Sequence, residues 1–247
     1  MSAAPEAPLT EQRRRAVRSQ GLSVGIATGM YGVSFGALSV ASGLSILQTQ
    51  ALSALLFSGG SQFAVVGILG AGGSAVSAIA TSTLLGIRNG LYGLQVARFI
   101  ALPGPRRLLA AHLTIDESTA VGIAQEEPPA QRLGFWVTGI AVFIGWNLMT
   151  LVGAIVGNAL GKPQTWGLDA AAAAAFCALL WPRLRTGDGR ATAVLAAFIA
   201  LVTLPLVPAG IPVILAAFAA VVVGWVGPGR HELPSVEDGF PGSDPVP

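Results

Sequence analysis

Long apolar segments, separated by short polar ones, dominate this chain. Residues 19–87 contain no Asp, Glu, Lys, Arg or His. A helix needs about 20 apolar residues to cross the hydrocarbon core of a bilayer, so this stretch alone allows more than two crossings. Seven segments are expected to form membrane helices: 21–47, 50–72, 74–97, 134–160, 166–182, 191–207 and 209–227. The pattern predicts an all-α polytopic integral membrane protein with about six to seven transmembrane segments.

Composition supports the lipid bilayer as the surroundings of this chain. Hydrophobic residues make up 53% of it and charged residues only 11%, with a mean hydropathy of +0.68, whereas soluble domains carry about 25% charged residues. We expect a basic segment over 1–20, a transmembrane domain over 21–227 and a disordered tail over 228–247. The apolar stretch after the basic start exceeds the roughly 7–15 residues of a signal-peptide core, so it is interpreted as a retained helix.

The distribution of Lys and Arg predicts how the segments cross the membrane. If every segment spanned it with the N-terminus inside, more of these cations would lie outside than inside, against the positive-inside rule. If 50–72 instead entered and left on the outer side, only Lys162 among the connecting cations would lie outside. This topology places both termini in the cytoplasm.

A cluster of small and polar residues gives 50–72 a reason to break. The cluster lies mid-segment and comprises Ser58, Gly59, Gly60, Ser61 and Gln62. Two adjacent glycines cost about 2 kcal/mol of helix propensity relative to alanine, and hydroxyl groups compete for backbone hydrogen bonds. Transporters hold substrates at broken helices of this kind. The alternative is a continuous helix whose small residues permit close packing.

Arg88 lies inside the apolar segment 74–97. It is about ten residues, or roughly 15 Å, from the expected membrane edge at Arg98. Helical spacing places the following residues near one face, expected to point inward: Thr81, Leu84, Arg88, Tyr92 and Gln95. Either the helix ends near Gly90 and Arg88 reaches the interface, or Arg88 and Asn89 pair with an acid or bind a carboxylate.

Asp116 and Glu117 interrupt a mostly apolar stretch and are the candidate acids. Adjacent carboxylates repel each other, so one of them could hold a raised pKa suited to carrying a proton. The same residues could instead mark a helix start, with Thr114 or Asp116 as the N-cap. His112 has no neighbour at metal-ligand spacing, and a solvated or hydrogen-bonded role is expected. Asp169 is either the N-cap of 166–182 or a contact at the outer mouth.

Two glycine series with a spacing of four residues predict close helix packing, within the chain or against a partner subunit. They are Gly21, Gly25 and Gly29, and Gly153, Gly157 and Gly161.

Several classes of function lack their sequence signature. The chain has no Walker loop, nucleotide fingerprint or HExxH motif, and its single Cys177 offers neither a disulfide framework nor a thiolate metal site. Its cations lie at membrane edges, where topology explains them without nucleic acid. We therefore expect no cofactor, no metal and no nucleic-acid partner.

Six motifs together give this chain a family resemblance. They are SFG at 34–36, FSGGSQFAVV at 57–66, IRNGLYG at 87–93, LTIDES at 113–118, GWNLMTLVGAIVG at 145–157 and GLDAAAAAAFCALL at 167–180. The chain resembles the AzlC family, the large subunit of two-component branched-chain amino acid exporters. The family's third-helix motif commonly reads closer to NxRHxLYG, whereas here Asn89 and Gly90 follow Arg88.

The resemblance implies export of hydrophobic amino acids such as valine across the bacterial inner membrane, with a small AzlD-like membrane subunit as partner. We expect a secondary transporter rather than an enzyme. The expected substrate-binding residues are Ser58, Gly59, Gly60, Ser61, Gln62, Arg88, Asn89 and Tyr92, and the expected proton-coupling residues are Asp116 and Glu117. The alternatives are an intramembrane serine hydrolase with Ser61 as nucleophile and His112 as base, and a passive channel or scaffold.

Overall fold

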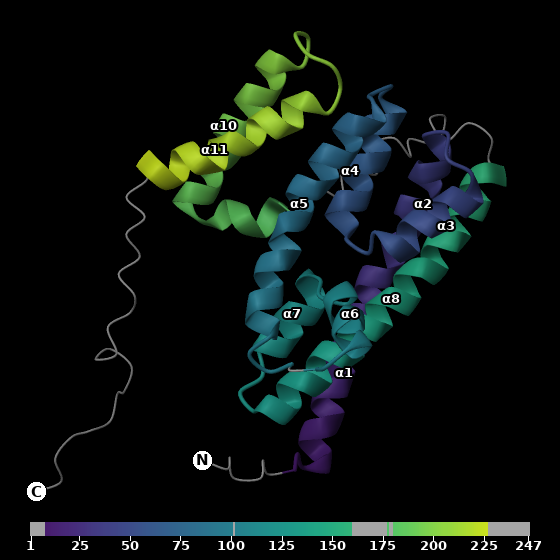
Figure 1. The fold of residues 1–247 in the computed structure, drawn as a ribbon, viewed down its shortest axis with the longest axis vertical. Coiled ribbons are helices and arrows are strands. Elements are labelled where there is room, and N and C mark those ends of the chain that lie inside the picture. Colours follow the sequence, from purple (N-terminus) through teal and green to yellow (C-terminus); the bar gives the residue numbers. More distant parts are fainter. Residues whose placement is uncertain (1–7, 101, 160–176, 178–179, 227–247) are drawn as a thin grey trace, which may run out of the picture.

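The computed structural model describes residues 8–100, 102–159, 177 and 180–226, and this part of the chain is all-helical with no strand. The helices follow in the order α1 Glu11–Met30, α2 Gly32–Ala41, α3 Ile46–Leu55, α4 Gly59–Gly70, α5 Ala75–Val96, α6 Pro105–His112, α7 Asp116–Ile123, α8 Pro128–Ala159, the short 3₁₀ turn η2 Trp181–Arg185, α10 Gly187–Thr203 and α11 Ile211–Val226 (Figure 1). The all-α prediction is therefore confirmed.

The first apolar segment differs from the expected helix over 21–47. It begins at Glu11, because the Thr10 side chain accepts a hydrogen bond from the Arg13 amide at 3.2 Å and caps the helix. A turn at Tyr31 separates α1 from α2, which ends at Ala41. The basic residues near the start thus belong to the first turns of α1.

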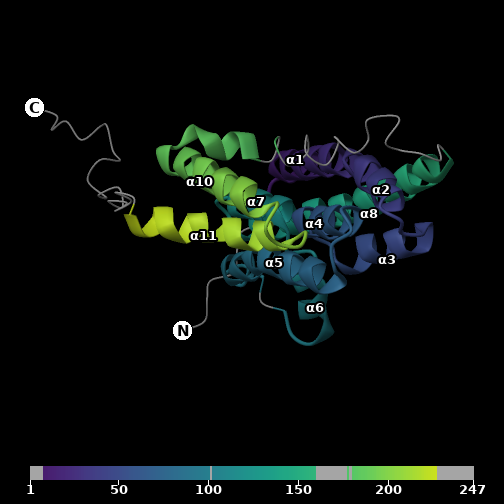
Figure 2. The same ribbon diagram turned by 90° about the horizontal axis from the view of Figure 1, so that it is seen from above.

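Glycines let α1 and α2 lie directly against α8, as Figures 1 and 2 show. A methyl group added at Gly29 would lie 3.0 Å from the carbonyl carbon of Gly145. One added at Gly36 would collide with the Thr150 carbonyl oxygen, and one at Gly153 with the Val33 carbonyl oxygen. The glycine series therefore packs helices within the chain, as the spacing predicted. Gly161 lies outside the described residues.

Two helical stretches are long and apolar enough to cross a membrane by length and composition. They are Glu11–Ala41, with 31 residues, and Pro128–Ala159, with 32 residues; an 18-residue window within each has a mean hydropathy of 1.4 and 2.0, respectively. Two shorter helices, α4 and α11, are also apolar. The expected segment 166–182 lies almost entirely outside the described residues, and so does Asp169.

The predicted break in 50–72 is present. α3 ends at Leu55, Ser58 is extended with φ −155° and ψ 100°, and α4 starts at Gly59. Only the residues before Gly59 interrupt the helix, because Gly59 to Gln62 form the first turn of α4. The Gln62 amide closes that turn on the Ser58 carbonyl at 2.9 Å.

α5 is continuous through Gly90 to Val96, so the alternative in which it ends near Gly90 is wrong. Its inner face carries buried Ala78, Thr81 and Ser82. Two members of the expected inward stripe, Leu84 and Gln95, are exposed. The buried face of α5 is centred between Thr81 and Ser82, roughly 100° round the helix from both of them.

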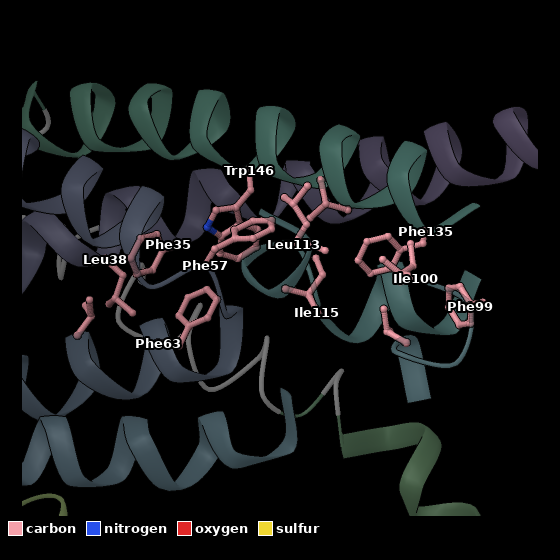
Figure 3. Packing of buried hydrophobic residues seen from close by; sticks show 14 residues of the cluster. Phe35, Leu38, Phe57, Phe63, Phe99, Ile100, Leu113, Ile115, Phe135 and Trp146 are labelled. Atoms are coloured by element: carbon pink, nitrogen blue, oxygen red, sulfur yellow. The ribbon is translucent and has the colours of Figure 1, made fainter. Parts of the chain in front are cut away.

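Aromatic rings fill the space between α2, α4 and α8. Trp146 stacks on Phe35 with centroids 5.9 Å apart and meets Phe63 edge-on at 6.2 Å. In Figure 3, Phe57 lies together with these three rings in one part of the buried cluster. Phe99 and Phe135 lie together at the opposite end. α10 and α11 pair with each other and touch the rest of the molecule through α5 (Figure 1). The core is therefore built from α1 to α8.

Candidate functional site

Three interruptions between helices meet at one cavity of about 190 Å³. They are the turn between α1 and α2, the break between α3 and α4, and the junction between α6 and α7. The cavity is lined by Thr28, Tyr31, Phe57, Ser58, Gly59, Gly60, Phe63, Arg88, Asn89, Ile115, Asp116, Glu117, Val142 and Trp146. Backbone amides and carbonyls that would be hydrogen-bonded within a continuous helix therefore lie around one small cavity.

The N-terminal turn of α4 forms one wall of this cavity. Its first amides, from Gly59, Gly60 and Ser61, have no partner within the helix, and no side chain caps them. A methyl group at Gly60 would lie 3.2 Å from Arg88 Nη2, and one at Gly59 would lie 3.6 Å from the Trp146 ring. Glycine thus lets a guanidinium group and an indole ring approach a helix start that carries partial positive charge.

Arg88 of α5 and Asp116 of α7 both line the cavity and form an ion pair with each other. Arg88 Nη1 lies 2.9 Å from Asp116 Oδ2, and both side chains are about two-thirds buried. Arg88 Nε, Asp116 Oδ1 and the neighbouring Asn89 Oδ1 are buried without a hydrogen-bond partner among the described residues. The interpretation that Arg88 pairs with an acid agrees with this geometry. The pair leaves one donor and one acceptor unused, and Asn89 beside it adds a second unused acceptor.

The start of α7 differs from both capping alternatives. Ile115 occupies the N-cap position, so neither Thr114 nor Asp116 caps the helix. Thr114 Oγ1 instead donates to the Ala110 carbonyl at 2.8 Å. Ser118 Oγ accepts from the Ile115 amide at 3.1 Å and donates to the Leu113 carbonyl at 2.6 Å. This hydroxyl fixes the bend that turns the first residues of α7 toward α5.

Glu117 is the second acid of α7. This helix has eight residues and is too short to span a membrane. Burial raises the pKa of the Glu117 carboxyl above its usual 4.5, and the neighbouring Asp116 carboxylate adds to the rise. A backbone hydrogen bond and the Arg88 guanidinium oppose the rise. The carboxyl can therefore hold a proton at a higher pH than an ordinary glutamate.

Three expected substrate-binding residues do not line the cavity. Ser61 is fully buried, and its hydroxyl donates to the Ser82 carbonyl at 3.0 Å. Gln62 is also fully buried, and its side-chain Nε2 donates to the Ser53 carbonyl at 3.1 Å. This bond satisfies a carbonyl near the end of α3. Tyr92 is half-buried one turn beyond Arg88. Ser61 and Gln62 hold the broken helix together.

The apolar wall is the part of the cavity that sequence reasoning missed. Phe57 and Phe63 directly flank the small-residue cluster, so their positions in the chain could have indicated them. Trp146 comes from α8, and no local pattern links it to α4. Its indole Nε1 is buried without a partner among the described residues. Tyr31 reaches the cavity because the helix turns there.

The geometry gives no support to the hydrolase alternative. Ser61 is bonded to Ser58 at 3.3 Å and to Ser82, whereas the His112 ring packs against Phe57 at 5.8 Å and Phe143 at 5.6 Å. Within the described ranges, no group of three or more His, Cys, Asp or Glu residues is placed to hold a metal ion.

Comparison with known proteins gives one match. The family model described as AzlC protein matches residues 23–160, more than half of the chain, and this range contains every residue that lines the cavity. Neither curated proteins nor solved structures gave a match. The AzlC family is associated with branched-chain amino acid transport, generally pairs with a small AzlD subunit and is not known for enzymatic activity. By this match, the chain belongs to the AzlC family.

Proposed function

We propose that this protein is a secondary active transporter that exports branched-chain or other hydrophobic amino acids across the bacterial cytoplasmic membrane. The observation that carries the proposal is the cavity itself. An uncapped helix start and an ion pair with unused hydrogen-bonding atoms face an apolar wall in one small space. This combination suits a solute with a charged end and an apolar end.

The size of the cavity favours a small solute. Its volume of about 190 Å³ lies below the roughly 300–1,000 Å³ of pockets that hold drug-sized ligands. Phe63, Val142 and Trp146 offer an apolar surface to an aliphatic side chain. A free amino acid meets both conditions better than a peptide or a lipid does.

The first turn of α4 supplies the anion-binding end of the proposed site. Uncapped amides at a helix N-terminus attract carboxylates, and transporters use the starts of broken helices in this way. The first turn of α4 contains no acidic residue that would compete for these amides. We assign the substrate carboxylate to Gly59 and Gly60, next to the Arg88 guanidinium.

Asp116 and Glu117 are the proposed proton-coupling residues. Both lie in the first turn of α7 and line the cavity. Glu117 is the stronger candidate, because burial favours its protonated form and Asp116 is already paired with Arg88. A proton bound at Glu117 from one side of the membrane and released to the other would drive export.

The proposed topology places 21–227 in the membrane as a transport domain with about six to seven spans. α3 and α4 form the re-entrant pair, and the ends 1–20 and 228–247 lie in the cytoplasm. A small AzlD-like membrane subunit is the proposed partner.

L-valine counterflow tests the proposal. The chain would be reconstituted in proteoliposomes with an AzlD-type subunit, and vesicles preloaded with unlabelled valine would be mixed with labelled valine. A carrier concentrates the label transiently and saturates with substrate. Arg98, exposed beyond the end of α5, provides the matched control: Arg98→Gln should keep counterflow, whereas Arg88→Gln should abolish it.

Other outcomes would select the alternatives. Unsaturable valine flux without counterflow identifies a passive channel, and the absence of flux in the wild type identifies a scaffold. Covalent labelling of Ser61 by a fluorophosphonate would revive the hydrolase hypothesis.

A further inference from the structure

The Arg88–Asp116 ion pair uses only part of its hydrogen-bonding capacity. A guanidinium and a carboxylate can form two parallel hydrogen bonds, which is the stronger arrangement. Here Arg88 Nη1 reaches Asp116 Oδ2 at 2.9 Å, while Arg88 Nε and Asp116 Oδ1 are buried and unpaired in the described chain. Unused donors and acceptors in buried charged groups are costly, so they normally have a partner.

The two unused atoms require different partners. Arg88 Nε can only donate, and Asp116 Oδ1 in its ionised form can only accept. A molecule that satisfies both must carry an acceptor and a donor a short distance apart. The zwitterion of a free α-amino acid carries a carboxylate and an ammonium on one carbon atom.

We propose that the substrate zwitterion inserts between Arg88 and Asp116, so that Arg88 binds its carboxylate and Asp116 binds its ammonium. The inference rests on the proposed transport function and adds what the site requires of its substrate, which is both charged groups. It also separates the two acids, giving Asp116 a substrate-binding role and leaving the proton to Glu117.

Charge balance supports insertion. Before binding, the Arg88 guanidinium and the Asp116 carboxylate are in direct contact, with 2.9 Å between Nη1 and Oδ2. After insertion, the order is guanidinium, carboxylate, ammonium and carboxylate, so every charge still has an opposite neighbour. Removing a charge from its partner is expensive away from water, and this exchange leaves neither side chain unpaired.

The neighbouring groups fit the same arrangement. Arg88 Nη2 lies beside Gly60, so a carboxylate on Arg88 also meets the uncapped amides of α4. Asn89 Oδ1, a second unused acceptor one residue away, is available to the ammonium group. Each end of the zwitterion thus has two sources of hydrogen bonds.

Insertion would also couple substrate binding to the contact between α5 and α7. Arg88 belongs to α5 and Asp116 to α7, and the ion pair is a direct link between them. A substrate between the two side chains replaces that link with a longer one.

Competition by substrate analogues tests the inference. Valine counterflow would be measured in the wild type with two analogues, 2-oxoisovalerate, which lacks the ammonium, and isobutylamine, which lacks the carboxylate. We expect each to inhibit at least about tenfold more weakly than valine, the factor that corresponds to one lost charged hydrogen bond. Equal inhibition by either analogue would overturn the inference while the transport function stands.

Asp116→Asn adds a second measurement. The variant should bind valine about tenfold more weakly and 2-oxoisovalerate as well as the wild type does, because only valine carries the group that Asp116 holds. Asp188→Asn is the matched control, since Asp188 is an exposed first-turn acid of α10. An unchanged preference for valine over 2-oxoisovalerate in Asp116→Asn would contradict the proposal. If Asp116→Asn fails to insert, the wild-type analogue ratios decide. Absence of wild-type counterflow would instead reject the transport function itself.

Discussion

Two helix starts face the same cavity, and they differ in how their partial positive charge is compensated. α7 begins with Asp116 and Glu117, so its own carboxylates lie at the positive end of the helix. α4 begins with Gly59 and Gly60, and its first turn carries no acid and no side-chain cap. The start of α7 is thus compensated from within the chain, whereas that of α4 remains open to an anion from outside.

The two helix starts also show which polar residues hold the backbone in place and which ones face the cavity. Ser118 ties the α7 start to Leu113 and Ile115 through short hydrogen bonds. On α4, Ser61 and Gln62 anchor the helix to α5 and α3, leaving the glycine amides unoccupied. Polar residues in both turns therefore divide into those that hold the backbone and those that face the cavity.

Among changes to the two helix starts, closing the open start of α4 should have the largest effect. Gly60→Ala places a methyl group 3.2 Å from Arg88 Nη2, so the guanidinium must move away from the α4 amides. We expect valine counterflow to fall about tenfold, which corresponds to the loss of one charged hydrogen bond. The protein should stay folded, because alanine is a better helix former than glycine.

Gly67→Ala is the control in the same helix, since nothing lies within 4 Å of the added methyl group. It should leave counterflow unchanged. Equal loss of transport in both variants would show that helix stiffness, rather than access to the α4 amides, is what matters.

Neutralising the compensated start should change pH dependence. Burial raises the pKa of Glu117, so the folded state binds this proton more tightly than the unfolded chain does. The contribution of Glu117 to stability is therefore highest below about pH 4.5 and falls as the pH rises through the pKa of this group in the folded state. Glu117→Gln lacks this titration and should melt at a higher temperature than the wild type at pH 8, with the difference shrinking toward pH 4.5.

Transport measurements should also depend on the Glu117 carboxyl group. If Glu117 carries the proton, Glu117→Gln should retain valine exchange but lose its acceleration by a proton gradient. Glu126→Gln, at an exposed position after α7, is the control and should behave as the wild type in both assays. A proton-driven Glu117→Gln variant would transfer the coupling role to another residue.

Removing one hydroxyl from each start should have the smallest effect. Ser118→Ala loses both hydrogen bonds that hold the α7 bend, and we expect about 1 kcal/mol less stability toward denaturation in detergent. Ser58→Ala should cost only a few tenths of that, because the Ser58 side chain makes no capping bond. Equal losses in the two variants would show that the α4 start is also fixed by its hydroxyl.

The helical class and the break near Gly59 followed from the amino-acid sequence alone. These features act locally: charge-free apolar length favours membrane helices, adjacent glycines weaken a helix, and an isolated charge needs a partner away from water. Ser58, Gly59, Gly60, Arg88, Asn89, Asp116 and Glu117 all reach the cavity as this reasoning suggested. The glycine spacing likewise indicated close packing, here of α1 and α2 on α8.

The partners that these residues contact depend on long-range packing. Trp146 meets Gly59 because α8 packs along α1 and α2, and no local pattern encodes that neighbour. The inward direction of Ser61 and Gln62 depends on carbonyls supplied by α5 and α3. Local propensity sets where a helix starts and stops, but long-range packing decides which of its atoms stay free to bind a solute.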